Sequence, residues 1–470
     1  MKNQATRRFR RASALAALAT LGIATALLVA CGGGNNNPVP AAPTATLTIN
    51  GSTSPFVNTL YNYEAVVTGA APTGYSWAWG DGSANASGNP VSKVWNKAGT
   101  FTATLTGTIP NTAAAIAAGG AATVSVSGSQ SGTAKHVPMA QGYAHYCAVQ
   151  ADTTVKCRGT NSWGQLGDGT TTHSPTTLVT VTGLTGVRQV AVGDEHSCAV
   201  KSDGTVACWG NNASGQLGNG TTTNQPTPIA VTGLTGVAMV RLGGAFSCAL
   251  KSDGTVQCWG TNSSGVLGDG TTTSRTTAGA VSGLANAVSL ESGLSHSCVV
   301  KADNSVACWG FNGFGQIGNG ATTAALLPAA ATGLTNAAAI AVGNLHTCAL
   351  KMDGTAMCWG LNNQGALGDG TTTNRSTPGA VTGLANGSAI ASGNGHVCVM
   401  RKTGDVVCWG ENATNALGDG TTTQRSTPAL ASAVAGLTTN AVAISSHIGG
   451  TNCVLTTTGT EICWGTPANN

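Results

Sequence analysis

The chain has 470 residues, which is too long for one ordinary domain and predicts two to four. Only 8% of the residues are charged and 4% are aromatic, while glycine alone contributes 67, a composition that favours strands and turns over helices. Five of the 21 basic residues lie in the first eleven positions, so the rest has 16 basic against 17 acidic residues and lacks the basic surface that would make nucleic acid an expected partner.

Residues 1–30 are predicted to be a signal peptide. The basic sequence RRFRR precedes an apolar stretch rich in alanine and leucine, from Ala12 to Ala30, and these two parts describe a secretory signal. The stretch ends in Leu28-Val29-Ala30-Cys31, which resembles the bacterial lipobox. The resemblance implies cleavage before Cys31 and a diacylglycerol on its thiol. A short transmembrane anchor is the alternative, because 19 residues could nearly span a bilayer.

Residues 31–45 are predicted to be a flexible tether. Their sequence GGGNNNPVPAAP is rich in glycine, asparagine and proline and cannot fold alone, which favours the lipoprotein over the transmembrane anchor. Gly32 stands where the lipoprotein signal for inner-membrane retention would place Asp. We therefore expect a lipid-anchored, extracytoplasmic protein of the outer membrane or cell surface. Periplasmic and outward-facing orientations both stay open.

Residues 46–127 are predicted to form a small β-sandwich. Short runs such as TATLTI and TFTATLTG alternate apolar and polar positions, as strands with one buried face do. The segments WAWGDG (Trp77–Gly82) and VWNKAGTFTATLTG (Val94–Gly107) resemble the PKD-type immunoglobulin-like domain, whose hallmark is an aromatic strand entering a G-D-G turn. Asp81 could bind a cation, but Asp before Gly usually supplies turn geometry, so we predict no metal. Residues 128–136 are expected to be a linker.

Seven cysteine pairs mark seven copies of one segment in residues 137–466. The two cysteines of each pair are ten positions apart, and the copies repeat every 50 to 55 residues, in the range of propeller blades. In the second copy, strand patterns fall at Val187–Val192, His196–Lys201, Thr205–Trp209 and near Pro226, and four antiparallel strands make one blade. The pairs are Cys147 with Cys157, Cys198 with Cys208, Cys248 with Cys258, Cys298 with Cys308, Cys348 with Cys358, Cys398 with Cys408, and Cys453 with Cys463.

The repeats resemble the regulator of chromosome condensation family, whose blades carry G-x-x-H, then D-G in a turn, then W-G-x-N-x-x-G-Q-L-G. The second copy matches at Gly193, His196, Asp203, Gly204, Trp209, Gly210, Asn212, Gly215, Gln216, Leu217 and Gly218. The resemblance covers about 330 residues and implies an all-β fold with a seven-bladed β-propeller. The end copies depart from it, with Arg158 where Trp recurs and no GQLGDGTTT segment in the last. We expect one blade to take its outer strand from the other terminus.

The cysteine pairs are predicted to form seven disulfides within the blades. If the hairpin turns through Ser202-Asp203-Gly204, with Gly204 in the left-handed conformation, then Cys198 and Cys208 face each other. Directly opposed residues have Cα separations of about 4.5–5.5 Å, which a disulfide accepts. A zinc site would instead need pairs spaced by two to four residues. Fourteen paired cysteines and lipidated Cys31 account for all 15, in agreement with export to an oxidising compartment.

No catalytic residue, metal or cofactor is predicted. Histidine recurs two positions before the first cysteine of five copies, but Phe246 and Thr451 stand there in the other two. A metal-binding ring of imidazoles is one interpretation, and a structural hydrogen-bonding role is the stronger one. Catalysis needs a unique constellation, whereas nearly every polar group here is repeated. The histidines are His145, His196, His296, His346 and His396.

The predicted function is that of a monomeric, cell-envelope binding or scaffolding module for a protein or a glycan. The alternatives are an extracytoplasmic hydrolase or lyase built on a propeller, and a secreted inhibitor, since secreted bacterial propellers of the resembled family inhibit β-lactamases. Guanine nucleotide exchange, the activity of the family's namesake, requires a cytosolic GTPase, and the export signal argues against it. The identity of the ligand stays open, as does any binding role of the PKD-type domain.

Ligand-binding residues are expected on one face of the propeller. Connections in an antiparallel blade alternate between the two faces, so the link at 194–195 and the long loop from Asn211 to Gln225 share a face. Loops on a rigid scaffold commonly carry binding residues, and specificity must come from positions that differ between copies. The predicted partner-binding residues are Trp163, Asp194, Glu195 and Phe314. For the two aromatic residues, packing against the neighbouring blade is the alternative.

Overall fold

In the computed structural model, every regular element of the described residues is a β-strand, which confirms the all-β prediction. No described helix is long and apolar enough to span a membrane. The predictions for Cys31, Asp81, the signal peptide and the linker lie outside the described residues, as does the tether except for Ala45, which begins β1. The structure describes residues 45–50, 60–69, 74–78, 86–87, 91–94, 99–108, 117–126, 139–142, 145–150, 152–446, 450–456 and 460–465.

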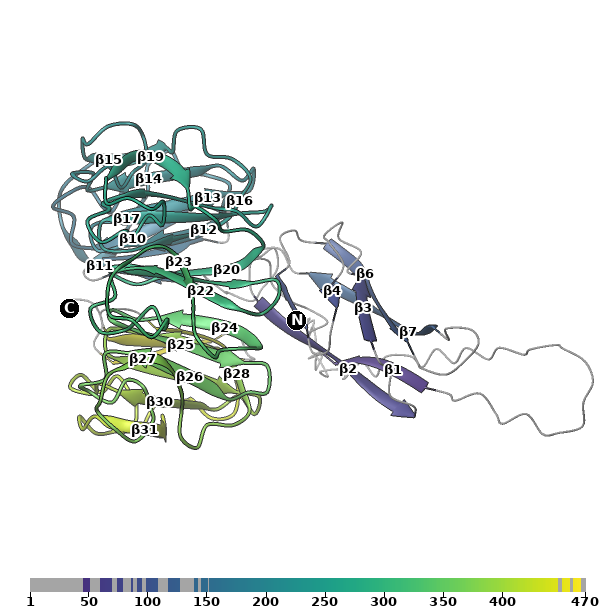
Figure 1. The fold of residues 1–470 in the computed structure, drawn as a ribbon. Coiled ribbons are helices and arrows are strands. Elements are labelled where there is room, and N and C mark those ends of the chain that lie inside the picture. The colour runs from purple at the N-terminus through teal and green to yellow at the C-terminus, as the bar shows by residue number, and fades with distance from the viewer. Residues whose placement is uncertain are drawn as a thin grey trace, which may run out of the picture. The chain divides into compact units, whose positions relative to one another are not determined.

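The N-terminal unit contains two β-sheets (Figure 1). Its alternating segments form the strands that the sequence pattern indicates, and β1 pairs antiparallel with β2 from Ala45↔Gly69 to Asn50↔Glu64. One sheet has the order β1 (Ala45–Asn50), β2 (Leu60–Gly69), β5 (Val91–Val94). The other has the order β4 (Ala86–Ser87), β3 (Gly74–Ala78), β6 (Gly99–Thr108), β7 (Ala117–Val126).

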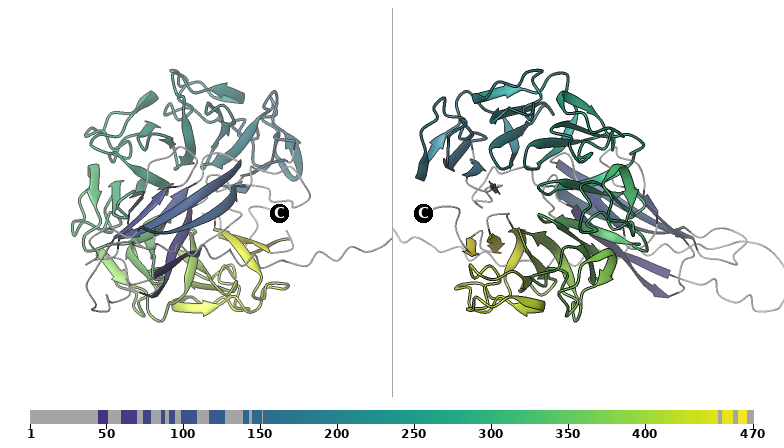
Figure 2. Two further views of the ribbon diagram at one scale, coloured as in Figure 1. Left: turned by 90° about the vertical axis from the view of Figure 1, so that its right-hand side faces the viewer. Right: turned by 60° about the vertical axis from the view of Figure 1, so that its left-hand side comes forward.

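The repeats form seven sheets, blades 1 to 7, around a common centre (Figure 2). The innermost strands contact those of neighbouring blades; they are β8 (Met139–Gln141), β12 (Val187–Val192), β16 (Val237–Leu242), β20 (Ala287–Ser292), β24 (Ala337–Val342), β28 (Gly387–Ser392) and β32 (Ala441–Ser446). The second strands are β9 (His145–Val149), β13 (His196–Lys201), β17 (Phe246–Lys251), β21 (His296–Lys301), β25 (His346–Lys351), β29 (His396–Arg401) and β33 (Thr451–Thr456). The third strands are β10 (Val155–Gly159), β14 (Val206–Gly210), β18 (Val256–Gly260), β22 (Val306–Gly310), β26 (Ala356–Gly360), β30 (Val406–Gly410) and β34 (Glu461–Gly465). The outermost strands are β11 (Ser174–Thr180), β15 (Gln225–Ala230), β19 (Arg275–Ala280), β23 (Ala325–Ala330), β27 (Arg375–Ala380) and β31 (Arg425–Leu430).

The hydrophobic core lies between adjacent blades. The tryptophan of the repeated W-G sequence is fully buried in blades 2 to 6, and its ring packs among residues of the preceding blade. Trp259 of blade 3, for example, donates from Nε1 to the backbone oxygen of Gln216 in blade 2 over 2.9 Å. Equivalent bonds run from Trp209, Trp309, Trp359, Trp409 and Trp464 to the blade before. Blades 2 to 7 are therefore each fastened to the preceding blade by this packing and by the indole hydrogen bond.

The seven predicted disulfides are present, each with a sequence separation of 10. They join Cys147 to Cys157, Cys198 to Cys208, Cys248 to Cys258, Cys298 to Cys308, Cys348 to Cys358, Cys398 to Cys408, and Cys453 to Cys463. Gly204 adopts a φ of 79°, and Lys201 N donates to Thr205 O, as the predicted three-residue turn requires.

The cysteines of each pair approach more closely than predicted. Their Cα separations of 4.0–4.1 Å are shorter than the expected range of about 4.5–5.5 Å. Strand alternation from the Lys201–Thr205 bond places Cys198 and Cys208 at a non-hydrogen-bonded pair, the type with the closer Cα atoms. The expected range also included the wider Cα separation of hydrogen-bonded pairs, which does not apply to these cysteines.

A buried asparagine organises each long loop between the third and fourth strands. In blade 2, Asn212 Oδ1 accepts from Leu217 N at 2.9 Å, and Nδ2 donates to the backbone oxygens of Thr221 and Thr223. This explains the repeated W-G-x-N sequence, because one carboxamide satisfies three backbone groups that the loop would otherwise leave unpaired. The equivalent residues are Asn161, Asn262, Asn312, Asn362 and Asn412.

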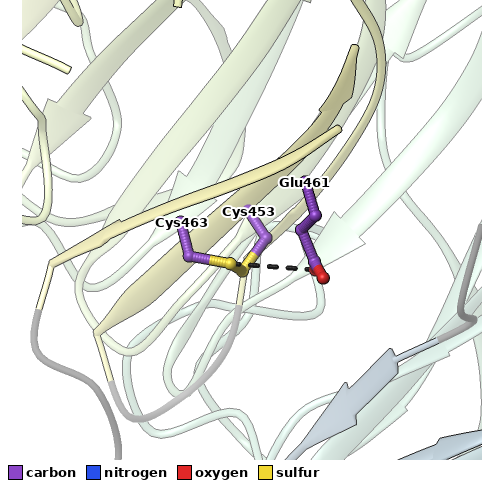
Figure 3. Close-up of side chains that lie close together, drawn as sticks. All are labelled: Cys453, Glu461 and Cys463. Carbon is purple, nitrogen blue, oxygen red and sulfur yellow. Dashed lines mark hydrogen bonds between the residues drawn. A yellow bond between two sulfur atoms is a disulfide. The ribbon is translucent and has the colours of Figure 1, made fainter. Parts of the chain in front are cut away.

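Blade 7 has three strands among its described residues, 441–446, 450–456 and 460–465. Cys463 on β34 is exposed, whereas both cysteines of the other six disulfides are fully buried. Figure 3 shows the Cys453–Cys463 disulfide beside Glu461, whose Oε1 lies 3.7 Å from the Cys463 sulfur. These side chains could be metal ligands, but the disulfide occupies both sulfur atoms. That the other terminus supplies an outer strand here stays a prediction.

Exposure predicts which disulfide is reduced first. Brief treatment of the native protein with dithiothreitol, followed by alkylation, is expected to label Cys453 and Cys463, because thiol exchange requires access to a sulfur atom. Peptide mapping by mass spectrometry measures the labelling, and the buried Cys298–Cys308 pair is the internal control. Equal labelling of both pairs would contradict the prediction and would favour an outer strand that covers β34, as β15 covers Cys208 in blade 2.

Candidate ligand-binding face

The links between first and second strands lie on the same face of the propeller as the long loops. In blade 2 the link 193–195 and the loop 211–224 meet where Asn211 N donates to Glu195 O at 2.9 Å. The same bond joins residues 261 and 245, 311 and 295, 361 and 345, and 411 and 395. We call this surface the long-loop face, and it carries all four predicted partner-binding residues.

Trp163 is the most prominent aromatic side chain of the long-loop face. It is 41% exposed, although the sequence also allowed packing against the neighbouring blade. Its backbone N–H donates to Gln165 Oε1 at 2.9 Å, so the loop that presents it is fixed from below by a buried glutamine. An exposed indole on a rigid loop loses little conformational freedom when it is covered by a partner, which suits it to an interface.

Phe314 lies on the same face, in blade 4, and is half-buried. Its ring packs against Phe311 of its own loop with centroids 6.2 Å apart and planes at 70°. An edge-to-face pair of this kind adds stability beyond the buried area alone. Phe314 is therefore partly accessible, and the ring contact found for it lies within its own loop and not against the neighbouring blade.

Asp194 and Glu195 form an acidic pair on the blade 2 link. Glu195 is exposed and its Oε2 accepts from Asn211 Nδ2 at 2.7 Å. Asp194 is half-buried, and burial, together with the neighbouring charge of Glu195, raises the pKa of Asp194 to about 6. Near neutral pH the pair thus presents a charge that changes with small shifts in pH.

The structure brings three of the four predicted residues into one neighbourhood. The blade 1 loop adjoins the blade 2 link, because a Cβ at Gly210 would lie 2.6 Å from Glu195 O and 3.1 Å from the Cα of Gln165. Trp163 is two residues from Gln165, whereas Phe314 belongs to blade 4.

The sequence patterns did not predict a role for Asn211 and Phe311, which each stand directly before the repeated asparagine. The signal that could have indicated them is the variation of that position between copies.

The recurrent histidines join blades to one another. Each is buried, and its Nε2 lies within hydrogen-bond distance of a polar side chain of the next blade, as for His145 and Ser197 at 2.8 Å. The corresponding pairs are His196–Ser247, His296–Thr347, His346–Ser392 and His396–Asn452. Burial lowers the pKa of His296 to about 3, so the ring is neutral. The structural interpretation of these residues is confirmed.

Comparisons with known proteins agree with this geometry. Residues 155–470 match the family model of the RCC1-like domain, and residues 40–126 match that of the PKD domain. Human "Probable E3 ubiquitin-protein ligase HERC4" is 39% identical over 84 residues, which cover 17% of this chain and only 8% of that protein.

Two solved structures share the propeller fold. Human WBSCR16 aligns with a TM-score of 0.59 and 21% identity over 70% of this chain and 87% of its own. Prp20p from Saccharomyces cerevisiae, described with its binding to Gsp1p and histones, aligns with a TM-score of 0.58 and 21% identity over 70% of this chain and 81% of its own. At this identity the likeness concerns the fold alone.

Proposed function

The chain belongs to the RCC1-like domain family, and on this premise we propose that it is a cell-envelope lipoprotein that holds a protein or glycan ligand on the long-loop face. The observation that carries the proposal is the division of each long loop into fixed and variable parts. The buried asparagine fixes the backbone, while exposed positions such as Trp163 differ from blade to blade. Function on a rigid scaffold is commonly placed in such positions.

A protein is the favoured ligand, and no enzymatic activity is proposed. Prp20p, which shares the fold, is described as binding Gsp1p and histones, and this supports protein recognition by such a propeller. The ligase activity in the name of HERC4 belongs to a protein of which the matched segment covers 8%. The serine–histidine pairs His145–Ser197 and His196–Ser247 are buried between blades, and Nδ1 of both histidines has no hydrogen-bond partner, so neither pair has an orienting acid.

Alanine at Trp163 is expected to weaken ligand binding about tenfold, or about 1.4 kcal/mol, because a few aromatic anchors dominate interface energies. Alanine at Asp194, Glu195 or Phe314 is expected to weaken it less. Crosslinking on intact cells and mass spectrometry would first identify the ligand, and affinity would then be measured for each variant. The melting temperature of the Trp163 variant should stay nearly unchanged.

Leu430→Ala is the matched control. Leu430 is 49% exposed but lies on the outer strand β31, away from the long-loop face, so its loss should leave the affinity unchanged. Unchanged affinity of all four site variants would show that the ligand uses another surface.

The envelope location is tested by the intact mass of the mature protein. We expect loss of residues 1–30 and addition of a diacylglycerol to Cys31, and Cys31→Ser is expected to release the protein from the membrane fraction. An uncut N-terminus would contradict the lipoprotein assignment.

A further inference from the structure

A small pocket opens on the long-loop face between blades 5 and 6. Its volume is about 120 Å³, room for several water molecules or part of a small ligand. It lies where the blade 5 loop passes between two links, 344–345 of its own blade and 394–395 of the next. The fixed sequence pattern of the repeats does not predict it.

The first residue that makes room for the pocket is Ala366. Blades 1, 2 and 4 have a buried glutamine at this position, and in blade 4 Oε1 of Gln316 accepts from the backbone N–H of Phe314 at 3.0 Å. Alanine removes both the volume and the acceptor. No described group accepts from the equivalent N–H of Gln364, so a backbone donor is left free beside the pocket. The glutamines are Gln165, Gln216 and Gln316.

The second residue is Gly395. Glu195, Ala245, Ser295 and Leu345 stand at the equivalent positions of blades 2 to 5. Gly395 has no positive φ, so its backbone does not require glycine. A Cβ there would lie 2.6 Å from Gln364 Oε1 and 3.0 Å from Glu411 Oε2. A side chain at residue 395 would therefore displace Gln364 and fill the pocket.

The lining of the pocket is rich in carboxamides and has no charged side chain. Its histidine, His346, is neutral, and Glu411 lies beside the pocket without lining it. Asn344 Nδ2 donates to Asn394 Oδ1 at 2.9 Å, which fixes this pair and leaves further donors and acceptors on both groups. The side chains of Asn363 and Gln364 make no hydrogen bond to any described residue. Leu345 and Leu361 supply apolar wall. The carboxamides are those of Asn344, Asn363, Gln364 and Asn394.

This chemistry selects among ligand classes. A charged ligand would find no opposite charge in the lining, and a wholly apolar ligand would leave the carboxamides of the lining without partners. A hydroxyl group both donates and accepts, as a carboxamide does, and a ring with several hydroxyls matches a set of carboxamides around two leucines. An extended peptide would need a groove, whereas this pocket is confined to the junction between two links.

We propose that the pocket between blades 5 and 6 binds one neutral sugar residue, such as the end unit of a glycan. The proposal rests on the proposed function in that it also uses the long-loop face, and it narrows the ligand class at this place to neutral carbohydrate. The pocket is formed by blades 5 and 6, so it is separate from the predicted site around Trp163 and Asp194 in blades 1 and 2.

The test titrates the full chain, in detergent micelles, with D-glucose, D-galactose, D-mannose and N-acetyl-D-glucosamine, with binding followed by saturation-transfer NMR. At least one sugar is expected to bind with a dissociation constant on the order of 1 mM. Ala366→Gln and Gly395→Leu are expected to weaken that binding at least about tenfold. Both introduce residues that equivalent positions of other blades already carry, Gln216 in blade 2 and Leu345 in blade 5, and neither adds a charge beside Glu411.

Ala245→Leu is the matched control, because it introduces the same residue as Gly395→Leu at the equivalent link of blade 3. It should leave sugar binding unchanged. The proposal is overturned if no sugar binds the wild type, if both pocket variants keep its affinity, or if only a peptide probe such as N-acetylglycinamide binds. Capture of an envelope ligand that depends on Trp163, without any sugar binding, would leave the proposed function standing and remove only this inference.

Discussion

Lowering the pH from 7 to 5 is expected to reduce the free energy of unfolding of the propeller by several kcal/mol. His145, His196, His296 and His346 have their pKa lowered to about 3, mainly because burial disfavours the charged ring. Between pH 6.5 and 3 the unfolded chain therefore binds more protons than the folded one, so stability falls as the pH falls. Each histidine accounts for about 2 kcal/mol at pH 5.

Two carboxylates act in the opposite direction, because burial raises the pKa of both Asp194 and Glu461. The folded state raises the pKa of Asp194 to about 6, so at pH 5 the folded chain gains a proton that the unfolded chain does not. This contribution is smaller than that of a single histidine, because the pKa of Asp194 lies only one unit above pH 5. The four imidazoles therefore decide the sign.

His296→Phe tests the origin of the pH dependence. Phe246 is the natural residue at this position in blade 3 and is fully buried there. In the variant, Thr347 Oγ1 keeps its bond to Gln316 O at 2.9 Å. The loss of stability between pH 7 and pH 5, measured by urea titration, should shrink by about 2 kcal/mol. His173→Phe, at an exposed position, is the control. An unchanged pH dependence in His296→Phe would contradict the assignment of the stability loss to the buried histidines.

Replacing Trp259 with alanine is expected to lower the free energy of unfolding by about 3–5 kcal/mol. The indole is fully buried between blades 2 and 3, and it packs so closely against Gly218 that a Cβ there would lie 2.7 Å from its Nε1. Gln216 O keeps the hydroxyl bond from Ser247, so the cost arises chiefly from the cavity. Trp259→Phe should cost less, because it keeps most of the ring volume.

Trp163→Ala is the control for this experiment, because it removes the same side chain from an exposed position. It should change the free energy of unfolding by no more than about 0.5 kcal/mol. Denaturant titration at pH 7 measures both variants. Equal effects of the two substitutions would show that the interblade packing does not carry the stability attributed to it.

The sequence predicted most of the propeller because the same pattern recurs, with few departures, in seven successive copies. The pattern of blade 2 predicted β12 and β13 at their observed bounds and β14 one residue early. The alternation of apolar and polar residues is the signal that indicates such strands. The disulfides followed from the D-G turn. The exposure of Cys463 could not be predicted, because it depends on which strands cover β34.

The candidate site was less predictable because it depends on differences between copies. Trp163 and Phe314 stood out as aromatic residues, but their unequal exposure depends on Phe311, which pairs with one of them. The pocket needed two departures, Ala366 and Gly395, which lie 29 positions apart and meet only where adjacent blades touch. A pattern read along one repeat does not contain such a contact.

The buried asparagine of each long loop has a consequence for how such a protein changes over evolutionary time. Because Asn212 and its equivalents satisfy the loop backbone from within, a substitution at the exposed positions beside them leaves the loop conformation in place. Gene duplication of a blade thus supplies copies of one loop that can diverge independently. Each junction between neighbouring blades can therefore acquire its own binding site by substitution, while the loops of the other blades keep their conformation.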